Sequence, residues 1–167
     1  NKYFQYQACE KIIIPYPKTL NIKLATDLEI IDTLNFPLLI KPSSRKNFNL
    51  DVFRTLYIEV YEDYIKAKTN LIEKLKEGFE FVISEYIPGD DTNLYIYTCF
   101  RSEDSKILNE WNGKKLTQYP DAFGVFSSAS NESTDTVLIQ GRALVDSLDA
   151  KGIVEAEFKY DERDGQF

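Results

Sequence analysis

The stretch SEYIPGDD, residues 84–91, places three carboxylates around a turn that follows the apolar run FEFVI. Pro88 and Gly89 are turn-forming residues, so a strand that ends here is expected. The turn alone does not explain why Glu85, Asp90 and Asp91 lie beside the strand end. A solvated turn is the simpler interpretation of these eight residues alone. The rest of the chain favours a binding role for them.

Missing residue types narrow the chemistry that the chain can perform. It has no histidine, which excludes Ser-His and Cys-His nucleophile systems and histidine-ligated metal sites within these residues. Neither GxxxxGK[ST] nor GxGxxG occurs, so the sequence lacks the motifs of the common glycine-rich phosphate-binding loops. Lysine and carboxylate chemistry remains, and it suits an anionic substrate bound with a hard cation such as Mg²⁺.

Composition indicates a globular protein that works away from nucleic acid and membranes. The 167 residues are 43% hydrophobic and 28% charged, with a net charge of −7 that disfavours nonspecific nucleic-acid binding. No apolar run approaches the roughly 20 residues that span a bilayer, and the N-terminus lacks the pattern of a signal peptide. Cys9 and Cys99 match no metal or disulfide spacing, so we expect reduced, packed thiols and a cytoplasmic location.

The two ends of the chain predict a piece of a longer protein. Methionine is absent, so residue 1 is not a native start. GIVEAEFKYDERDGQF reads as a strand, a turn over 161–165 and the first residues of a return strand. We therefore expect a fragment that is incomplete at its C-terminus. Residues 151–160 would then be a partly unpaired edge, through which the chain could form a homo-oligomer.

Hydrophobic periodicity predicts a first lobe over residues 1–86 and a second over 87–167. Helices are expected at 2–12, 25–35, 62–78 and 134–149, the second of them with Thr26 as N-cap and Glu29 completing a capping box. Strands are expected at 36–43, 53–60, 79–87, 93–100, 106–120 and 152–161, with a bend near Asn112 and polar loops at 43–53 and 121–133. Strands grouped with helices on one side indicate an α+β class.

The order of the polar motifs resembles the ATP-grasp superfamily. They are Lys2, Lys41 in PLLIKPS, the stretch SEYIPGDD, then GKKLTQYP, then VEAEFKYDERDG. The chain is most similar to the carboxylate–amine ligase branch, which includes proteins like the carbamoyl phosphate synthase large subunit and D-aspartate ligase. The resemblance covers nearly the whole chain, and it depends on the order and spacing of the motifs more than on any one of them.

The resemblance implies a fold in which two α+β lobes with antiparallel sheets clasp ATP. Glu85 and Ile87 match the linker that binds adenine, mainly through main-chain groups, and Asp91 matches the acid that accepts hydrogen bonds from the ribose hydroxyls. Lys41 and Lys2 match lysines on the phosphates. For Lys41 the alternative is a strand-end lysine whose ammonium reaches solvent, and for Lys2 a solvated residue in a first helical turn.

Two further segments match the catalytic side of the family. Lys115 fits the lysine near the γ-phosphate or acyl phosphate, with a surface lysine as the alternative. Thr117 stands where the branch usually has an arginine, which puts recognition of the carboxylate substrate in question. Glu157 matches an acid that binds Mg²⁺, and Glu155, on the same strand face, is expected to be a spectator.

The resemblance therefore implies an ATP- and Mg²⁺-dependent ligase that joins small-molecule carboxylate and amine substrates through an acyl phosphate. The 167 residues alone are expected to lack ligase turnover. The alternatives are a non-catalytic nucleotide-binding module and an interaction domain of similar architecture.

Overall fold

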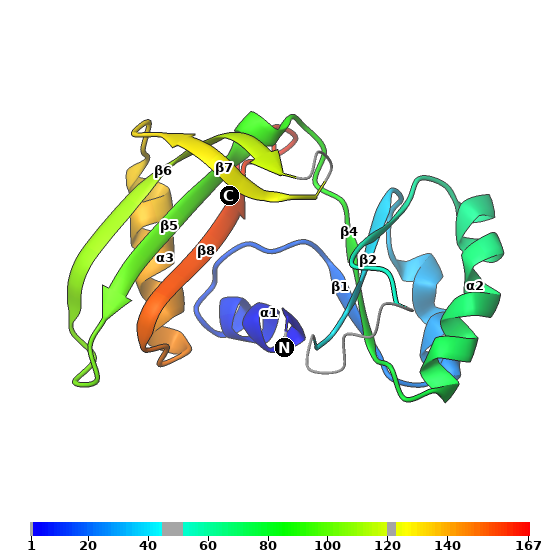
Figure 1. Cartoon of the computed structure of the whole chain (residues 1–167). Coiled ribbons are helices and arrows are strands. Elements are labelled where there is room, and N and C mark those ends of the chain that lie inside the picture. Colours follow the sequence, from blue (N-terminus) through cyan, green and yellow to red (C-terminus); the bar gives the residue numbers. More distant parts are fainter. Residues whose placement is uncertain (1, 45–51, 120–122) are drawn as a thin grey trace. The chain divides into compact units, whose positions relative to one another are not determined.

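The computed structural model describes residues 2–44, 52–119 and 123–167. The chain divides into two compact units, one of residues 1–7 and 17–86 and the other of residues 8–16 and 87–167. Each unit contains one antiparallel four-stranded sheet together with helices, which confirms the predicted α+β class (Figure 1). Among the described residues, no helix is both long and apolar enough to cross a membrane.

The first unit packs two helices on one face of its sheet. The strands, in the order β1-β4-β2-β3, are β1 (Thr19–Ile22), β4 (Phe81–Glu85), β2 (Leu38–Pro42) and β3 (Leu56–Ile58), and the helices are η1 (Ala25–Thr33) and α2 (Tyr61–Lys76). The buried Tyr64 of α2 donates a hydrogen bond to the carbonyl of Leu28 in η1, over 3.1 Å. Leu38 and Ile40 are fully buried in this core. Strand alternation therefore turns Leu39 and Lys41 toward the face opposite the helices.

The second unit packs α3 (Asp135–Ser147) on one face of a sheet ordered β7-β6-β5-β8. Its strands are β5 (Leu94–Arg101), β6 (Ile107–Tyr119), β7 (Val125–Ser130) and β8 (Gly152–Lys159). Tyr97 of β5 is fully buried against α3, and a Cβ on Gly141 would lie only 2.3 Å from the Cγ of Tyr97. Close approach of helix and strand therefore requires glycine at this position. Cys9 and Ile14 join the same core.

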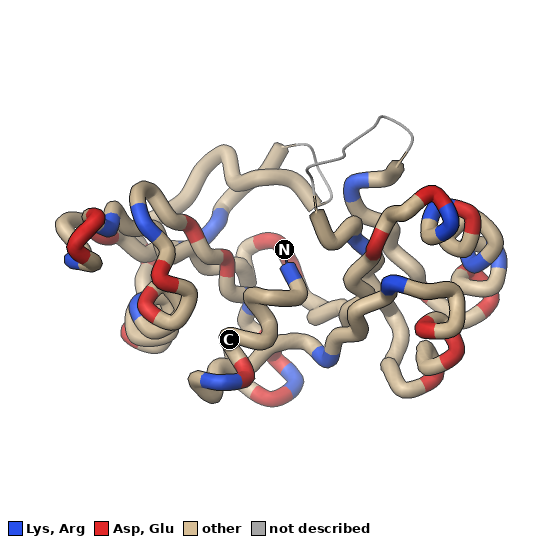
Figure 2. The backbone as a smooth tube through the Cα atoms, turned by 90° about the horizontal axis from the view of Figure 1, so that it is seen from below, with Lys and Arg blue, Asp and Glu red and all other residues tan. Residues whose placement is uncertain are grey.

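The N-terminal helix α1 (Lys2–Lys11) begins in the first unit, and its C-terminal part belongs to the second. Acidic and basic residues are interspersed along both units (Figure 2), and the chain as a whole carries a net charge of −7. Both cysteines are buried free thiols, as predicted, and burial raises the pKa of Cys9.

Several local predictions were wrong. Thr26 is not an N-cap: Asp27, one residue later, reaches back and accepts hydrogen bonds from the N–H groups of Lys23 and Leu24, over 2.8 and 2.9 Å. The segment 121–133 was predicted to be a loop, but it contains the strand β7. Residues 121 and 122 of that segment lie outside the described part of the chain, and so do residues 45–51 of the other predicted loop. The register between β6 and β7 shifts beyond Lys115, and the bend expected near Asn112 stays a prediction.

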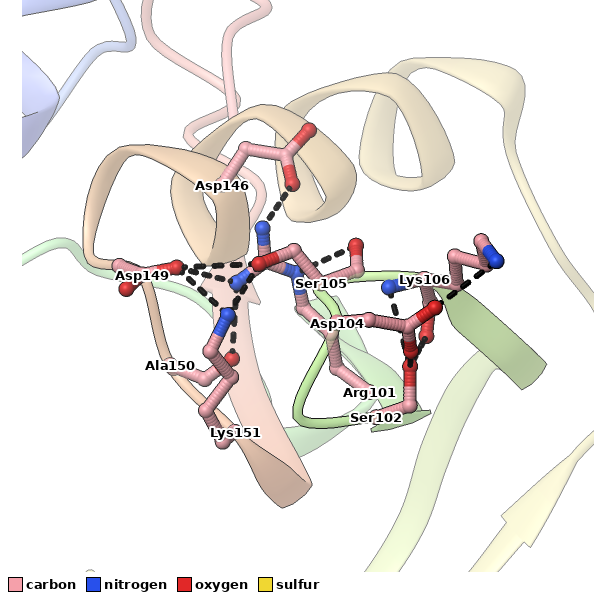
Figure 3. Close-up of polar contacts among 9 residues, drawn as sticks. All are labelled: Arg101, Ser102, Asp104, Ser105, Lys106, Asp146, Asp149, Ala150 and Lys151. Atoms are coloured by element: carbon pink, nitrogen blue, oxygen red, sulfur yellow. Dashed lines mark hydrogen bonds and ion pairs between the residues drawn. The ribbon is translucent and has the colours of Figure 1, made fainter.

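Arg101 joins the end of β5 to the end of α3 (Figure 3). Its guanidinium is 6% exposed and donates hydrogen bonds to Asp146 and Asp149, each over 2.9 Å. It also donates to the carbonyls of Ala150 and Ser105, over 3.1 and 3.2 Å. A buried cation with four acceptors makes charge-assisted hydrogen bonds that a typical surface ion pair lacks.

We predict that Arg101→Met destabilises the fold by about 1–3 kcal/mol, the scale for losing hydrogen bonds to charged groups. Lys106→Met is the matched control, because the Lys106 side chain is 73% exposed and pairs with Asp104. It should change stability by no more than about 0.5 kcal/mol. Urea unfolding of both variants measures the difference. Equal losses would mean that Arg101 contributes no more than a surface pair.

Candidate functional site

The turn within SEYIPGDD is built around Gly89. Its φ of +103° is a conformation that side-chain-bearing residues rarely adopt, and a Cβ at this position would lie 2.5 Å from the Nδ2 of Asn93. The chain then forms a short 3₁₀ turn, η2 (Asp91–Asn93), that leads into β5. The carbonyl of Asn93 accepts a hydrogen bond from the N–H of Tyr160, over 2.8 Å. The turn is therefore held against the end of β8.

Asp91 lies on this turn with its carboxylate exposed. The Oδ2 atom of Asp91 accepts a hydrogen bond from the Nε2 of Gln118 on β6, over 2.6 Å. Its other oxygen, Oδ1, has no hydrogen-bond donor within the described part of the chain. Gln118 thus orients the carboxylate and leaves one oxygen open to a ligand.

One face of the second sheet carries the charged residues of β8. Ile96 and Thr98 of β5 lie opposite Glu157 and Glu155, and directly paired residues share a face. Tyr97, between them in sequence, packs on α3. Glu155 and Glu157 therefore point to the face without α3, as the two-residue period of a strand predicts.

Lys115 reaches across β5 to Glu157. Its side chain is 1% exposed, and its Nζ lies 3.4 Å from the Oε1 of Glu157, whose side chain is 42% exposed. The ammonium also donates to the carbonyl of Gly124, over 3.2 Å. A buried cation needs such acceptors, because an unpaired charge away from water is costly. Lys115 is thus not the surface lysine of the alternative interpretation.

The carboxylate of Glu155 lies beside this pair. Desolvation raises the pKa of Glu155, the negative charge of Glu157 adds to the rise, and the positive charge of Lys115 opposes it. Among the described residues, no three histidine, cysteine or acidic side chains gather into a group that could hold a metal ion. Glu155 and Glu157 are thus the acidic oxygens that this face offers.

Sequence reasoning missed Lys159. Its Nζ donates hydrogen bonds to the carbonyls of Gly89 and Asp90, over 2.6 and 2.9 Å. Partial burial lowers the pKa of Lys159, while the charges of Asp91 and Asp90 oppose that shift. The available signal was the period of two from Glu157 to Lys159 in EFKYD, which places both on one face.

In the first unit, the predicted residues lie at separate points. Lys41 lies on β2 opposite Val82, and Lys2 is the first residue of α1. The Glu85 carboxylate accepts hydrogen bonds from the backbone N–H and the Nδ2 of Asn35, over 2.8 and 3.1 Å. This carboxylate is therefore committed to the loop that precedes β2.

The linker after β4 has main-chain groups of both kinds. The N–H groups of Glu85 and Tyr86 donate to the carbonyls of Lys18 and Pro37, over 3.0 and 2.9 Å. Ile87, counted to the second unit, has no main-chain hydrogen bond to any described residue. Its N–H and C=O are available to a ligand.

Thr117 is held in a group of hydroxyls. Its Oγ1 lies 2.8 Å from the Oγ of Ser127 and 2.6 Å from that of Ser128 on β7. This position offers hydrogen bonds but no positive charge.

A pocket of about 420 Å³ lies elsewhere in the second unit. Its lining consists of Glu110, Trp111, Asn112, Asn131, Ser133 and Leu138, and it includes none of the predicted site residues. Glu110 accepts hydrogen bonds there from Tyr97 and Arg142, which satisfy its charge.

No family model matches the chain. A D-aspartate ligase from Enterococcus faecium (strain Aus0004) is 24% identical over 177 residues, which cover 100% of this chain and 42% of the ligase. The chain thus spans less than half the length of this relative.

Solved structures show the same fold. The ADP complex of N5-carboxyaminoimidazole ribonucleotide synthetase matches with a TM-score of 0.74 and 16% identity, over 99% of this chain and 42% of the synthetase. An L-amino acid ligase from Bacillus licheniformis matches with a TM-score of 0.65 and 17% identity, over 99% of this chain and 40% of the ligase. The chain therefore has the ATP-grasp fold that its motifs predict, and its sequence is similar to that of a D-aspartate ligase.

Proposed function

We propose that the protein containing this chain is an ATP-dependent ligase that activates a carboxylate as an acyl phosphate and transfers the acyl group to an amine. The observation that carries the proposal is a group of charged residues in the second unit. It consists of the Asp91 carboxylate, which Gln118 orients, and the buried ion pair between Lys115 and Glu157. The relationship to a D-aspartate ligase supports the reaction class.

The proposed nucleotide contacts use the open groups of Ile87 and Asp91 together with two lysines of the first unit. The N–H and C=O of Ile87 suit the hydrogen-bonding edge of adenine, and its side chain offers an apolar contact to the ring. The open Oδ1 of Asp91 suits a ribose hydroxyl. Lys41 and Lys2 supply positive charge for phosphates, and Glu85 acts through its main chain because Asn35 occupies its carboxylate.

Mg²⁺ fits the oxygen donors of this face. It is normally held by one or two carboxylates together with substrate phosphates, and Glu157 would supply that kind of ligand, with Glu155 beside it as a spectator. When bound, the ion would neutralise charge on the phosphates.

The reaction needs positioning and charge neutralisation more than acid–base groups. A carboxylate oxygen of the acid attacks the γ-phosphorus of ATP, the bond to the bridging oxygen breaks, and ADP leaves. The amine then attacks the acyl carbon, inorganic phosphate leaves and the amine loses a proton. Lys115, whose ammonium is buried between Gly124 and Glu157, would act through its positive charge on the negative charge that the transferred phosphoryl group develops.

A non-catalytic nucleotide-binding module is the second candidate. Thr117, which replaces the branch's arginine, is bonded to serine hydroxyls and brings no cation for a substrate carboxylate. This candidate predicts ATP binding without substrate-dependent turnover. The absence of turnover by the 167 residues alone stays a prediction.

Asp91→Ala should weaken ATP binding by about 1–3 kcal/mol, the scale for hydrogen bonds to a charged group. Binding of 2′-deoxy-ATP should fall much less, because one ribose hydroxyl is already missing. Asp90→Ala is the matched control, since Asp90 precedes it on the same exposed turn and uses its carbonyl to bind Lys159. Calorimetric titration of each variant with both nucleotides gives the comparison. Equal losses for the two nucleotides would remove Asp91 from the ribose site.

The intact protein should form ADP over many turnovers only when Mg²⁺, a carboxylate and an amine are all present, because without the amine the reaction stops at the acyl phosphate. Glu157→Gln should lower the affinity for Mg²⁺ in this assay by at least the roughly 10- to 100-fold that loss of a residue supporting a metal ligand costs. Glu155→Gln, two residues away on the same face, should have a smaller effect. An amino-acid panel with a coupled ADP assay measures both. ATP binding without any substrate-dependent ADP formation would favour the non-catalytic module.

A further inference from the structure

Lys159 connects two segments that are far apart in sequence. It ends β8, the strand that carries Glu157, and its ammonium binds the main chain of Gly89 and Asp90, directly before Asp91. Both bonds are charge-assisted, and one of them, at 2.6 Å, is short for this type. The side chain therefore acts on the turn itself and not only on a carboxylate near it.

The contacts around Lys159 favour one position of the turn. Tyr160 donates its N–H to the carbonyl of Asn93, and Asn93 in turn donates from Nδ2 to Glu162, over 2.9 Å. The side chain of Asn93 also lies directly against Gly89. These bonds fix the far end of the turn, and Lys159 fixes the near end, so Asp91 lies between two attachments to the end of β8.

The charges agree with this arrangement. Lys159 is partly buried and lies near the acidic Asp90 and Asp91. Its ammonium gives hydrogen bonds to the carbonyls of Gly89 and Asp90, as a partly buried donor requires. The cation also offsets the repulsion that two neighbouring carboxylates impose on the turn.

We propose that Lys159 is a positioning residue that holds the 89–91 turn against β8 and so presents the Asp91 carboxylate to the ribose of a nucleotide. The role rests on the proposed nucleotide binding, and it links the ribose contact to the strand that carries the predicted metal ligand. Direct contact of Lys159 with phosphate is the competing role. The two differ because a positioning residue affects adenosine and ATP alike, whereas a phosphate contact affects ATP alone.

The first arm of the test needs no nucleotide. Lys159→Met keeps most of the aliphatic stem and removes the ammonium, and Lys106→Met, on an exposed lysine of the same unit, is the control. Amide hydrogen exchange of the intact protein should become about tenfold faster at the Asn93 N–H, which donates to the carbonyl of Asp90, in Lys159→Met, with β5 unchanged. Unchanged exchange at this N–H would overturn the proposal. Faster exchange throughout the unit would also contradict it, because the effect would then be general unfolding.

The second arm measures binding of adenosine, ATP and 2′-deoxy-ATP. Lys159→Met should weaken adenosine and ATP by a similar factor, and the preference for ATP over its 2′-deoxy form should shrink. Lys159→Arg, which can still donate to both carbonyls, should recover part of that preference. Loss of ATP binding with adenosine binding intact would replace the positioning role by a phosphate contact. If the unaltered protein binds none of the three, the proposed function fails, and the exchange measurement still decides whether Lys159 holds the turn.

Discussion

The two-residue period of β8 is the constraint on which the candidate site depends. Phe158 is buried in the core beneath α3, so its neighbours in sequence must point to the other face of the sheet. That places Glu157 and Lys159 on the face without the helix, together with Glu155. A shift of one residue in the pairing of β8 with β5 would exchange these charges for apolar side chains. The packing of one aromatic ring thus sets the register of the whole charged face.

Burial of Lys115 is the second requirement. A nearly inaccessible ammonium is tolerated because Gly124 and Glu157 accept its hydrogen bonds. Glu157 is half-exposed, and it therefore serves two partners, the lysine within the protein and, in the proposed function, a cation outside it. Asp91 is also only partly occupied, because Gln118 donates to one carboxylate oxygen and leaves the other open. Both acids are oriented before any ligand arrives, which lowers the ordering cost of binding.

Much of this was predictable from local patterns. The alternation of β5 and β8 fixed the side on which Glu155 and Glu157 lie, and the Pro88-Gly89 turn signal marked the position of Asp91. Long-range contacts could not be predicted in this way. The bonds from Lys159 to Gly89 and Asp90 join residues about 70 apart, and no local pattern encodes such a distance. β7 was missed because its Ser-rich sequence lacks the apolar alternation of a half-buried strand.

Photolabelling with 8-azido-ATP, mapped by peptide sequencing, tests the central claim most directly. The account predicts labelling within residues 85–93, where the linker and the Asp91 turn lie, and suppression of that label by excess ATP. The second unit also holds the pocket lined by Trp111 and Asn131, which offers an aromatic ring and amide groups to a ligand. ATP-suppressible label confined to the peptides of that pocket, with none in 85–93, would contradict the account.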